Sequence, residues 1–334
     1  MNTSHAIRTI QYGIGPIGSA VARHVVESTG IRLVGAVDVD PTKVGRDLGE
    51  VINLGRRLGL TVVEGLGQVL ERTDADVVLH TTSSRFRLFR PQIEQTLEAG
   101  LDVVSTAEEL SFPWLAHPQE ARDIDALARR VGKTVLGTGI NPGFIMDVLP
   151  LSLTAICRRV DHIHVTRIIN ASTRRGPFQA KIGAGMTAEL FEARMAAGKM
   201  GHVGLPESMA MIFDTLGREL VEIESAVEPV IADREVETEH VYVEPGQVTG
   251  LRQVARGYTE DGEFVRLTYI AALGARDEGD AISISGDPDL EIKLRGTHGD
   301  TATVAMVVNA VPRVTAAAPG LITMRDLPIV TCWQ

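Results

Sequence analysis

Short apolar runs alternate with helix-like segments through the first 143 residues. The apolar runs predict strands, and the segments between them carry helix signals such as Pro16 at a start and Gly100 and Gly132 just past an end. Strands are expected at 8–12, 33–38, 61–64, 77–81, 102–106 and 134–137, and helices at 16–27, 67–71, 91–98 and 118–130. This alternation predicts an α/β fold, a Rossmann-type doubly wound parallel sheet with helices on both faces.

After Gly143 the pattern changes to longer β segments. Helices are expected at 144–157, 186–197 and 206–220, and strands at 161–170, 221–231, 236–243, 248–258, 264–273 and 281–285. Turn signals such as Glu260-Asp261-Gly262 favour antiparallel neighbours. This half predicts an α+β domain with a largely antiparallel sheet, one face covered by helices or by a twin subunit. An apolar helix at 301–311 is expected to end at Pro312.

These changes divide the chain into three segments. Residues 1–143 are predicted to form a dinucleotide-binding Rossmann domain, and residues 144–298 a substrate-binding and dimerisation α+β domain. Residues 299–334 are predicted to return to the Rossmann domain as a C-terminal segment, because so apolar a tail must pack on something. The chain's 334 residues are enough for two domains, each with its own core.

A glycine-rich turn joins the first predicted strand to the first helix. Three glycines have the Gly-x-Gly-x-x-Gly spacing, and an aspartate ends the second strand 20 residues later. In the dinucleotide fingerprint these glycines permit a tight turn and close approach of the pyrophosphate, and the acid accepts from a ribose hydroxyl. The residues predicted to bind the dinucleotide here are Gly13, Gly15, Pro16, Ile17, Gly18 and Asp38. The alternative is an ordinary glycine turn, which has no need of the acid.

Polar residues directly follow the fourth, fifth and sixth strands of the predicted sheet. Thr81, Thr82 and Ser83 come after the fourth strand, and Asn141 lies in an Asn-Pro-Gly turn after the sixth. Ligands of open parallel sheets bind beyond the carboxyl ends of the strands, so we expect these side chains to contact the cofactor. The Asn-Pro-Gly turn also fits a domain hinge, and both interpretations can hold together.

Two adjacent acids, Glu108 and Glu109, follow the fifth strand. A carboxylate at the mouth of a nicotinamide pocket can exchange protons with a substrate and stabilise a cation that develops beside it. We take Glu108 as the catalytic candidate and leave open whether Glu109 shares its role. The alternative is that both acids lead a solvated loop or a helix start, where acids are common.

The charged residues near Asp38 do not all favour the same cofactor. Asp38 repels a 2′-phosphate and favours NAD, whereas Lys43 and Arg46 can bind that phosphate if their loop folds back. The sequence therefore predicts NAD or NADP as the cofactor.

The amino-acid composition of the chain excludes some classes of binding partner. The net charge of -10 argues against nucleic acid, and no apolar stretch is long enough to span a membrane. Cys157 and Cys332 lie far apart, which predicts neither a disulfide framework nor a metal site. The first strand starts close to residue 6, which leaves no room for a signal peptide. We expect a cytoplasmic protein with small-molecule partners.

The polar stretch from Arg167 to Gly185 separates a strand from a helix. It is expected either to line the substrate pocket or to form a surface loop with solvated arginines. His162 and His164 alternate on a predicted strand and are taken as structural, because a metal would need further ligands. His298 is a candidate to reach the site from the returning segment.

Residues 40–50 and the 81–83 tip resemble the N-terminal domain of dihydrodipicolinate reductase. The catalytic His-His-x-x-Lys run and the Ser-Gly-Thr-Ala clamp of that enzyme have no counterpart in this chain. The resemblance therefore implies the fold of this domain and not that reaction.

The chain is more similar to the family of 2,4-diaminopentanoate dehydrogenase and related NAD(P)-dependent amine dehydrogenases. The likeness spans nearly the whole sequence, and its marks are the segments 105–109, 137–144, 171–183 and 299–303. It implies that the glutamate at the position of Glu108 handles ammonia or the amine. It also implies a homodimer built through the antiparallel domain.

The expected function is reversible reductive amination of a ketone or aldehyde with ammonia, or oxidative deamination of a primary amine in reverse. The apolar residues expected to line the substrate pocket are Phe144, Met146, Ile168 and Phe178. One alternative is a reductase of a carbonyl or preformed imine that uses no free ammonia. A third hypothesis, a dinucleotide sensor without catalysis, is disfavoured by the acidic tips.

Overall fold

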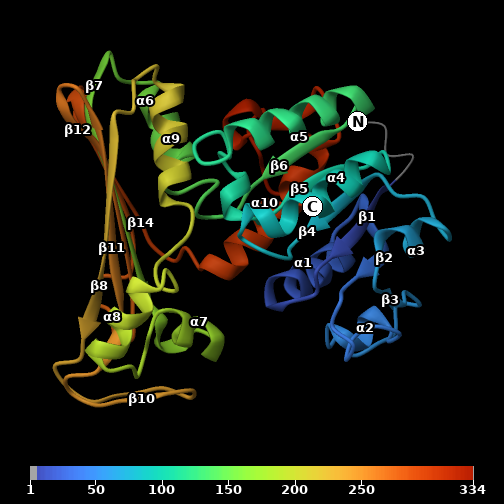
Figure 1. Cartoon of the computed structure of the whole chain (residues 1–334), viewed down its shortest axis with the longest axis horizontal. Coiled ribbons are helices and arrows are strands. Elements are labelled where there is room, and N and C mark those ends of the chain that lie inside the picture. Colours follow the sequence, from blue (N-terminus) through green and yellow to red (C-terminus); the bar gives the residue numbers. More distant parts are fainter. Residues whose placement is uncertain (1–5, 334) are drawn as a thin grey trace. The chain divides into compact units, whose positions relative to one another are not determined.

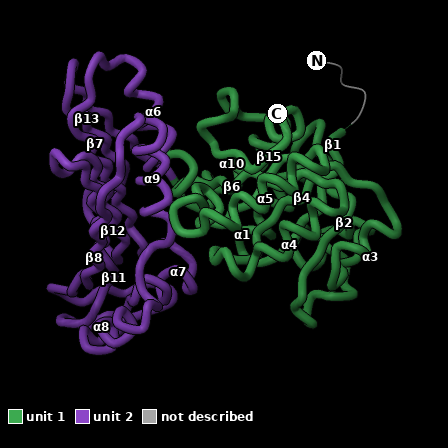
Figure 2. The backbone as a smooth tube through the Cα atoms, turned by 45° about the horizontal axis from the view of Figure 1, so that its top comes forward, with its two compact units in different colours: residues 1–144, 298–334 green, residues 145–297 purple. Residues whose placement is uncertain are grey.

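The chain divides into two compact units, which Figure 2 shows in different colours. Unit 1 comprises residues 1–144 and 298–334, and unit 2 comprises residues 145–297. The computed structural model describes residues 6–333. Within this range no helix is long and apolar enough to cross a membrane.

Unit 1 is built on a seven-stranded parallel sheet of order β15-β6-β5-β4-β1-β2-β3 (Figure 1). Its strands are β1 (Ile7–Tyr12), β2 (Ile31–Val37), β3 (Val62–Val63), β4 (Val77–His80), β5 (Asp102–Ser105), β6 (Thr134–Gly137) and β15 (Gly320–Ile322). Every neighbouring pair is parallel, which confirms the predicted doubly wound sheet. The three residues of β15, which the sequence pattern missed, add the last strand beside β6.

Helices cover both faces of this sheet. They are α1 (Pro16–Glu27), α2 (Leu48–Val51), α3 (Leu66–Leu70), α4 (Phe86–Glu98), α5 (Pro118–Val131) and α10 (Gly299–Val314), with the 3-10 turns η1 (Glu108–Leu110) and η3 (Met324–Asp326). Helix α1 packs on α10, whereas α4 and α5 pack on each other and bury apolar side chains against β5 and β6. The segment after residue 298 thus belongs to the core of unit 1.

In unit 1, two helix boundaries differ from the prediction at a proline. Helix α4 begins at Phe86 and not at Pro91, because the Glu109 carboxylate accepts the Phe86 amide from 23 residues away. Helix α10 continues past Pro312 to Val314, and its C-cap Thr315 donates its amide to Val311. A proline near a helix end removes only one hydrogen bond, which the packing of an apolar helix outweighs.

Unit 2 is built on a six-stranded sheet of order β14-β13-β7-β12-β11-β8. Its strands are β7 (Arg159–Asn170), β8 (Glu222–Ile231), β11 (Val248–Thr259), β12 (Gly262–Ala272), β13 (Gly279–Asp287) and β14 (Leu290–Leu294). Most pairs are antiparallel, as predicted, but β7 and β12 run parallel at the centre, so the sheet is mixed.

The single strand expected at 236–243 is instead a small hairpin of β9 (Val236–Glu237) and β10 (Tyr242–Val243). Thr238 closes the turn, because its amide donates to the Val241 carbonyl and its hydroxyl accepts the Val241 amide. This side-chain turn interrupts a sequence that otherwise alternates like one strand.

Four helices and one 3-10 turn complete unit 2, namely α6 (Val148–Thr154), α7 (Gly176–Lys181), α8 (Ala188–Ala196), α9 (Leu205–Thr215) and η2 (Ala171–Thr173). Helix α6 is shorter than the predicted 144–157, since the Asp147 carboxylate caps it by accepting the Val148 amide at 2.6 Å. Helix α9 lies on one sheet face, where a Cβ on Gly257 would meet Met209 and Phe213. Figure 1 shows α6 on this side as well.

A buried ion pair joins β7 to β13 on the same face as α9. The Arg167 guanidinium donates to Asp280 Oδ1 at 2.8 Å, and both side chains are 2% exposed. Arg167 also donates to the Thr297 carbonyl at 3.3 Å. Burial raises the pKa of Asp280, and the Arg167 charge opposes that rise. Arg167 is thus part of the core of unit 2, within the strand predicted at 161–170, and it is not one of the solvated arginines of the surface-loop alternative.

Replacement of Arg167 by Met is expected to destabilise the protein by about 3–5 kcal/mol, because it leaves the Asp280 carboxylate buried without its cation. Arg167→Met/Asp280→Leu should recover most of this loss, since no charge is then buried. The free energy of unfolding from urea titrations measures both changes. Equal stability of the single variant and the unaltered protein would contradict the role of the pair.

Candidate functional site

The glycine turn between β1 and α1 has the shape that its spacing predicts. Gly13 turns the chain at φ +87°, and a Cβ there would lie 2.8 Å from the Thr81 carbonyl oxygen. A Cβ on Gly18 would lie 2.0 Å from the Gly13 carbonyl oxygen, so α1 sits directly on the turn. By contrast, nothing lies within 4 Å of a Cβ at Gly15. The turn is thus closed at Gly13 and Gly18 and open at Gly15.

The start of α1 faces this open side without an anionic partner of its own. Gly15 is the N-cap and has no side chain to cap the helix, and Pro16 occupies the first turn. No acidic residue lies in the first turn. The positive end of the helix dipole and the free amides of the first turn therefore suit an anion such as a pyrophosphate.

A buried glutamine, which sequence reasoning missed, holds the turn together. Gln11 Nε2 donates to the Gly13 carbonyl at 2.9 Å and to Thr81 Oγ1 at 2.8 Å. Thr81 Oγ1 in turn donates to the Gly13 carbonyl at 2.7 Å. Thr81, which we predicted to bind the cofactor, therefore positions the turn with its hydroxyl. The alternation of polar and apolar residues in β1 gave no sign of a glutamine buried for this purpose.

Asp38 follows β2 and is tied to the same turn. Its Oδ2 accepts the Ile14 amide at 2.6 Å, its Oδ1 accepts the Asp40 amide at 2.9 Å, and its side chain is 9% exposed. Lys43 Nζ lies 3.2 Å from Asp38 Oδ2 and 3.3 Å from Asp40 Oδ2. The loop that carries Lys43 therefore folds back onto Asp38.

Arg46 lies in the same loop and remains exposed. Its guanidinium donates to the Thr42 carbonyl at 3.3 Å, which is a contact within the loop. Ser83 at the tip after β4 accepts the Arg85 amide at 3.1 Å. Thr82 Oγ1 donates to Gln92 Oε1 at 2.6 Å. Each of these predicted cofactor residues thus has a local partner at the carboxyl end of the sheet.

The two acids after β5 have different surroundings. Glu109 accepts the Phe86 amide with one oxygen and pairs with Arg85 at 2.9 Å with the other, while His117 Nε2 lies 3.7 Å away. These contacts anchor the start of α4. The half-buried Glu108 side chain has no hydrogen-bond or ion-pair partner in the described part of the chain. Of the two acids, Glu108 alone is available to a ligand.

The 3-10 turn that carries Glu108 is fixed on both sides. Before it, Ser105 Oγ accepts the Ala107 amide at 3.1 Å. After it, Ser111 Oγ donates to the Glu108 carbonyl at 2.7 Å. The turn also lies on β6, where a Cβ at Gly137 would come within 2.5 Å of the Leu110 backbone. The backbone of Glu108 is therefore held while its carboxylate stays unengaged.

His80, the last residue of β4, is a second functional candidate that sequence reasoning missed. It is completely buried, and burial lowers its pKa to about 4. Its Nδ1 lies 2.9 Å from Ser105 Oγ, and its Nε2 lies 2.7 Å from Gln92 Oε1 and 2.9 Å from Thr82 Oγ1. A histidine inside an apolar strand resembles a core residue in sequence, so only its partners single it out.

The turn after β6 brings Asn141 to the same edge of the sheet. Asn141 is 9% exposed, and a cis peptide bond joins it to Pro142. The preceding Ile140 amide donates to Thr303 Oγ1 in α10 at 3.4 Å. The half-buried Phe144 ends this stretch of unit 1. Asn141 and Phe144 therefore remain predicted site residues.

Three predicted pocket residues lie in unit 2. Met146 is fully buried, so it offers no surface to a ligand in this structure. Ile168 pairs across β7 with Ile270 of β12 and alternates with Arg167, which puts it on the sheet face opposite α9. Phe178 is half-buried in α7 under the Arg174 guanidinium, 4.7 Å from the ring centre. The stretch around Arg174 is therefore packed locally and is not a fully solvated loop.

The remaining histidine candidates have structural partners. His162 Nε2 lies 3.0 Å from Glu263 Oε1, and His164 Nε2 lies 3.2 Å from Thr268 Oγ1. His298 caps α10 by accepting the Thr301 amide at 3.4 Å, and its reach into the site stays a prediction. Among residues 6–333 no group of three or more His, Cys, Asp or Glu side chains could hold a metal ion.

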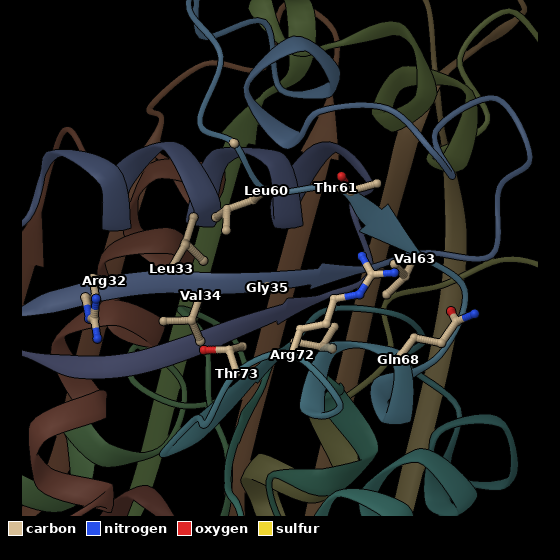
Figure 3. Close-up of a pocket in the computed structure, with 12 residues that line it drawn as sticks. Arg32, Leu33, Val34, Gly35, Leu60, Thr61, Val63, Gln68, Arg72 and Thr73 are labelled. Carbon is tan, nitrogen blue, oxygen red and sulfur yellow. The ribbon is translucent and has the colours of Figure 1, made fainter.

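A groove of about 380 Å³ opens elsewhere in unit 1, beside the amino half of β2 (Figure 3). Leu33, Val34 and Val63 form its apolar walls, and Figure 3 shows Arg72 extending across it toward Val63. None of the glycine, acid or hydroxyl residues described above lines it. The candidate site is thus at the carboxyl end of the sheet, away from this groove.

Comparison with known proteins agrees with this arrangement. The family model described as the 2,4-diaminopentanoate dehydrogenase C-terminal domain matches residues 144–334. The chain is 33% identical to 2,4-diaminopentanoate dehydrogenase of Acetoanaerobium sticklandii over 97% of its own length and 94% of the relative. It is 25% identical to an amine dehydrogenase of Streptomyces virginiae, covering 97% of this chain and 96% of that one.

A solved structure matches over nearly its full length. The amine dehydrogenase from Mycobacterium smegmatis superimposes with a TM-score of 0.87 at 27% identity, covering 99% of this chain and 98% of that one. Both the sequence and the fold therefore point to one family. The chain belongs to the 2,4-diaminopentanoate dehydrogenase family and is an oxidoreductase that acts on amines.

Proposed function

We propose that this protein is an NAD(P)-dependent amine dehydrogenase that converts a ketone or aldehyde and ammonia into a primary amine, and the reverse. The proposal rests on the different hydrogen-bond and ion-pair partners of two adjacent acids. Glu109 is engaged by Phe86 and Arg85, while the Glu108 carboxylate beside it has no protein partner in the described chain. A half-buried, unengaged carboxylate at the carboxyl end of a parallel sheet is suited to act on a bound substrate.

The residues of unit 1 fit a dinucleotide. Gly15 leaves room for a pyrophosphate at the uncapped start of α1, and Asp38 lies beside the turn where a ribose hydroxyl is expected. Asn141, Thr82 and Ser83 would lie nearer the nicotinamide. When bound, the cofactor supplies or accepts the hydride, and the protein supplies binding, orientation and proton transfer.

Glu108 is proposed to carry the proton transfers. In the aminating direction its carboxylate accepts a proton from ammonium, and the ammonia that is released attacks the carbonyl carbon. A proton then moves from the added nitrogen to the carbonyl oxygen, which becomes the hydroxyl of the carbinolamine. Glu108 returns its own proton to this hydroxyl, which leaves as water. The negative charge of Glu108 then stabilises the cationic iminium that remains. In the deaminating direction the same carboxylate accepts the proton of the water that attacks the iminium. Phe144 is proposed to shield this step from bulk water, and Phe178 stays as a pocket candidate in unit 2. Ile168 lies on the sheet face that we propose below as the dimer interface, which does not agree with its predicted place in the pocket.

The second candidate is a reductase that acts on a carbonyl or preformed imine without free ammonia. The same fold and cofactor serve both reactions, and a general acid at Glu108 suits either. The requirement for ammonium separates them. An aminating enzyme oxidises NAD(P)H with a ketone only when ammonium is present, whereas a carbonyl reductase shows the same rate without it.

We propose that the cofactor preference is set by the pair of Asp38 and Lys43. The Lys43 ammonium, 3.2 Å from Asp38, offsets the repulsion that this carboxylate exerts on a 2′-phosphate. This pairing supports acceptance of both NAD and NADP. Arg46, exposed in the same loop, is the other cation that a 2′-phosphate can meet.

We propose that the protein is a homodimer formed through the sheet face opposite α9. This face carries cross-strand charge pairs, among them Arg256 with Glu263 at 3.4 Å and Arg252 with Glu228 at 3.1 Å. At its centre Thr268 is 6% exposed and accepts or donates a hydrogen bond with His164. Paired charges around a less polar centre are typical of an interface between subunits.

Glu108→Gln keeps the size of the side chain and removes its charge. We expect the kcat of ammonium-dependent NAD(P)H oxidation to fall by about 10²–10⁴-fold, the range for loss of a general acid–base. The assay uses a panel of ketones and aldehydes with and without ammonium, and 2,4-diaminopentanoate with other primary amines in the reverse direction. NAD(P)H affinity, measured by fluorescence titration, should stay unchanged.

Glu109→Gln is the matched control for this experiment. It should lower the thermal stability of the protein, because α4 loses its charged cap, and leave kcat within a few-fold of the unaltered enzyme. If Glu108→Gln retained amination while Glu109→Gln lost it, the assignment of the two acids would be reversed. Retention in both variants would remove the proposed role of this turn.

Lys43→Met is expected to shift cofactor selectivity toward NAD. The ratio of kcat/KM for NADP to that for NAD should fall about tenfold, since one charged contact to a phosphate is worth on the order of 1–2 kcal/mol. Arg46→Met should change the ratio less, because Arg46 bonds within its own loop. An unchanged ratio in Lys43→Met would rule out a role for this lysine in the choice of cofactor.

Size-exclusion chromatography with light scattering should give twice the 36.0 kDa of one chain. Thr166→Arg puts an unpaired charge on the sheet face opposite α9 and should yield a monomer. The same substitution at the exposed Gln119 of α5 is the control and should leave the mass unchanged. A monomeric parent protein, or a dimeric Thr166→Arg variant, would contradict the proposed interface.

A further inference from the structure

A chain of hydrogen bonds, buried at His80 and Ser105, runs beneath the two strand tips nearest Glu108. It connects Thr82 and Gln92 to His80, His80 to Ser105, and Ser105 to the amide of Ala107. His80 and Ser105 are the last residues of β4 and β5 and pair directly across the parallel strands. Both are completely buried. The chain ends one residue before the turn that carries Glu108.

The partners of His80 fix the position of its proton. Gln92 Oε1 accepts hydrogen bonds only, so His80 Nε2 must carry the proton that it donates at 2.7 Å. Nδ1 is then an acceptor, and the Ser105 hydroxyl donates to it at 2.9 Å. The oxygen of Ser105 is left free to accept the Ala107 amide at 3.1 Å. Each donor in this chain therefore has an acceptor, and the His80 Nε2 proton has both Gln92 Oε1 and Thr82 Oγ1 within reach.

We propose that His80 is a positioning residue for the catalytic carboxylate of Glu108, acting through Ser105 on the backbone at Ala107. The inference rests on the proposed role of Glu108 and extends it. Tyr12 and Phe89 pack edge-on against the imidazole, with ring centres 5.7 and 6.2 Å away, and fix the plane of the ring. A fixed ring holds the Ser105 hydroxyl, and the hydroxyl holds the start of the turn.

The neutral state of the ring is part of this arrangement. If Nδ1 were protonated, Ser105 Oγ would have to accept from both His80 and Ala107, and its own proton would lose its acceptor. Burial disfavours the charged ring and holds the pKa of His80 near 4, so the neutral form with this bonding order is present at neutral pH. The hydrogen bond to Gln92 favours the charged ring, but burial outweighs it, and no carboxylate of the described residues is a hydrogen-bond partner of His80.

Two substitutions at His80 separate positioning from packing. His80→Asn keeps an acceptor at the place of Nδ1 and so keeps the bond from Ser105, but it removes more volume. His80→Gln keeps the volume and the reach toward Gln92 but removes the acceptor for Ser105. If His80 acts only by packing, His80→Asn should lower kcat more than His80→Gln does. If His80 acts by positioning, His80→Gln should lower kcat more.

We expect His80→Gln to lower kcat for ammonium-dependent turnover about 10- to 100-fold, as a misplacement of the carboxylate by about 1 Å would. His80→Asn should stay within about fivefold of the parent, and both should bind NAD(P)H as the parent does. Ser105→Ala, which deletes a single oxygen, should reproduce the loss of His80→Gln. The opposite order of the two His80 variants, or an unchanged kcat in Ser105→Ala, would overturn the proposal.

Combination with Glu108→Gln tests the path through Glu108. If His80 acts by positioning that carboxylate, His80→Gln should lower kcat little further once the carboxylate is gone. Full additivity of the two losses would overturn the positioning role and leave the role of Glu108 intact. Unchanged amination in Glu108→Gln alone would instead refute the proposed function, and the positioning role with it.

Discussion

The ion pair and hydrogen bond of Glu109 decide how the rest of the site is arranged. Its carboxylate is bound by the Phe86 amide and by Arg85, so it fixes η1 to the start of α4. Neighbours in a 3-10 turn point about 120° apart, so the anchoring of Glu109 turns Glu108 away from the same partners. Two identical adjacent side chains thereby acquire different tasks. One stabilises the fold, and the other stays available to a substrate.

The same division recurs along the carboxyl edge of the sheet. Thr81 and Gln11 use their polar atoms on the Gly13 turn, and His80 and Ser105 use theirs on the turn before Glu108. Polar groups in this layer mostly bind the backbone that surrounds the site, which removes their desolvation cost and leaves the backbone rigid. A site held in this way keeps its geometry without help from the ligand, and preorganisation of this kind is what electrostatic catalysis requires.

The sequence predicted the parallel sheet of unit 1 because short apolar runs and helix caps are local signals. It also located the glycine turn, Asp38 and the acids after β5, since these residues follow strand ends. It failed where distant contacts decide the structure. The start of α4 depends on Glu109, and the burial of Arg167 depends on Asp280 more than 100 residues away. His80 was missed for the same reason, because one buried histidine in an apolar strand acquires meaning only from its neighbours.

The pair of Asp38 and Lys43 shows why a fingerprint acid does not determine the cofactor by itself. A carboxylate after the second strand disfavours a 2′-phosphate through its charge, and that argument assumes the charge is unopposed. Here an ammonium lies 3.2 Å from it, and the Ile14 amide holds the same oxygen at 2.6 Å. The electrostatic field near the bound ribose is the sum of the contributions of these groups. Because the Asp38 carboxylate accepts the Ile14 amide, it also supports the glycine turn. On the proposed role of this pair, selectivity between the two cofactors would be a property of the whole loop from Asp38 to Arg46, and it would change without any substitution of the aspartate.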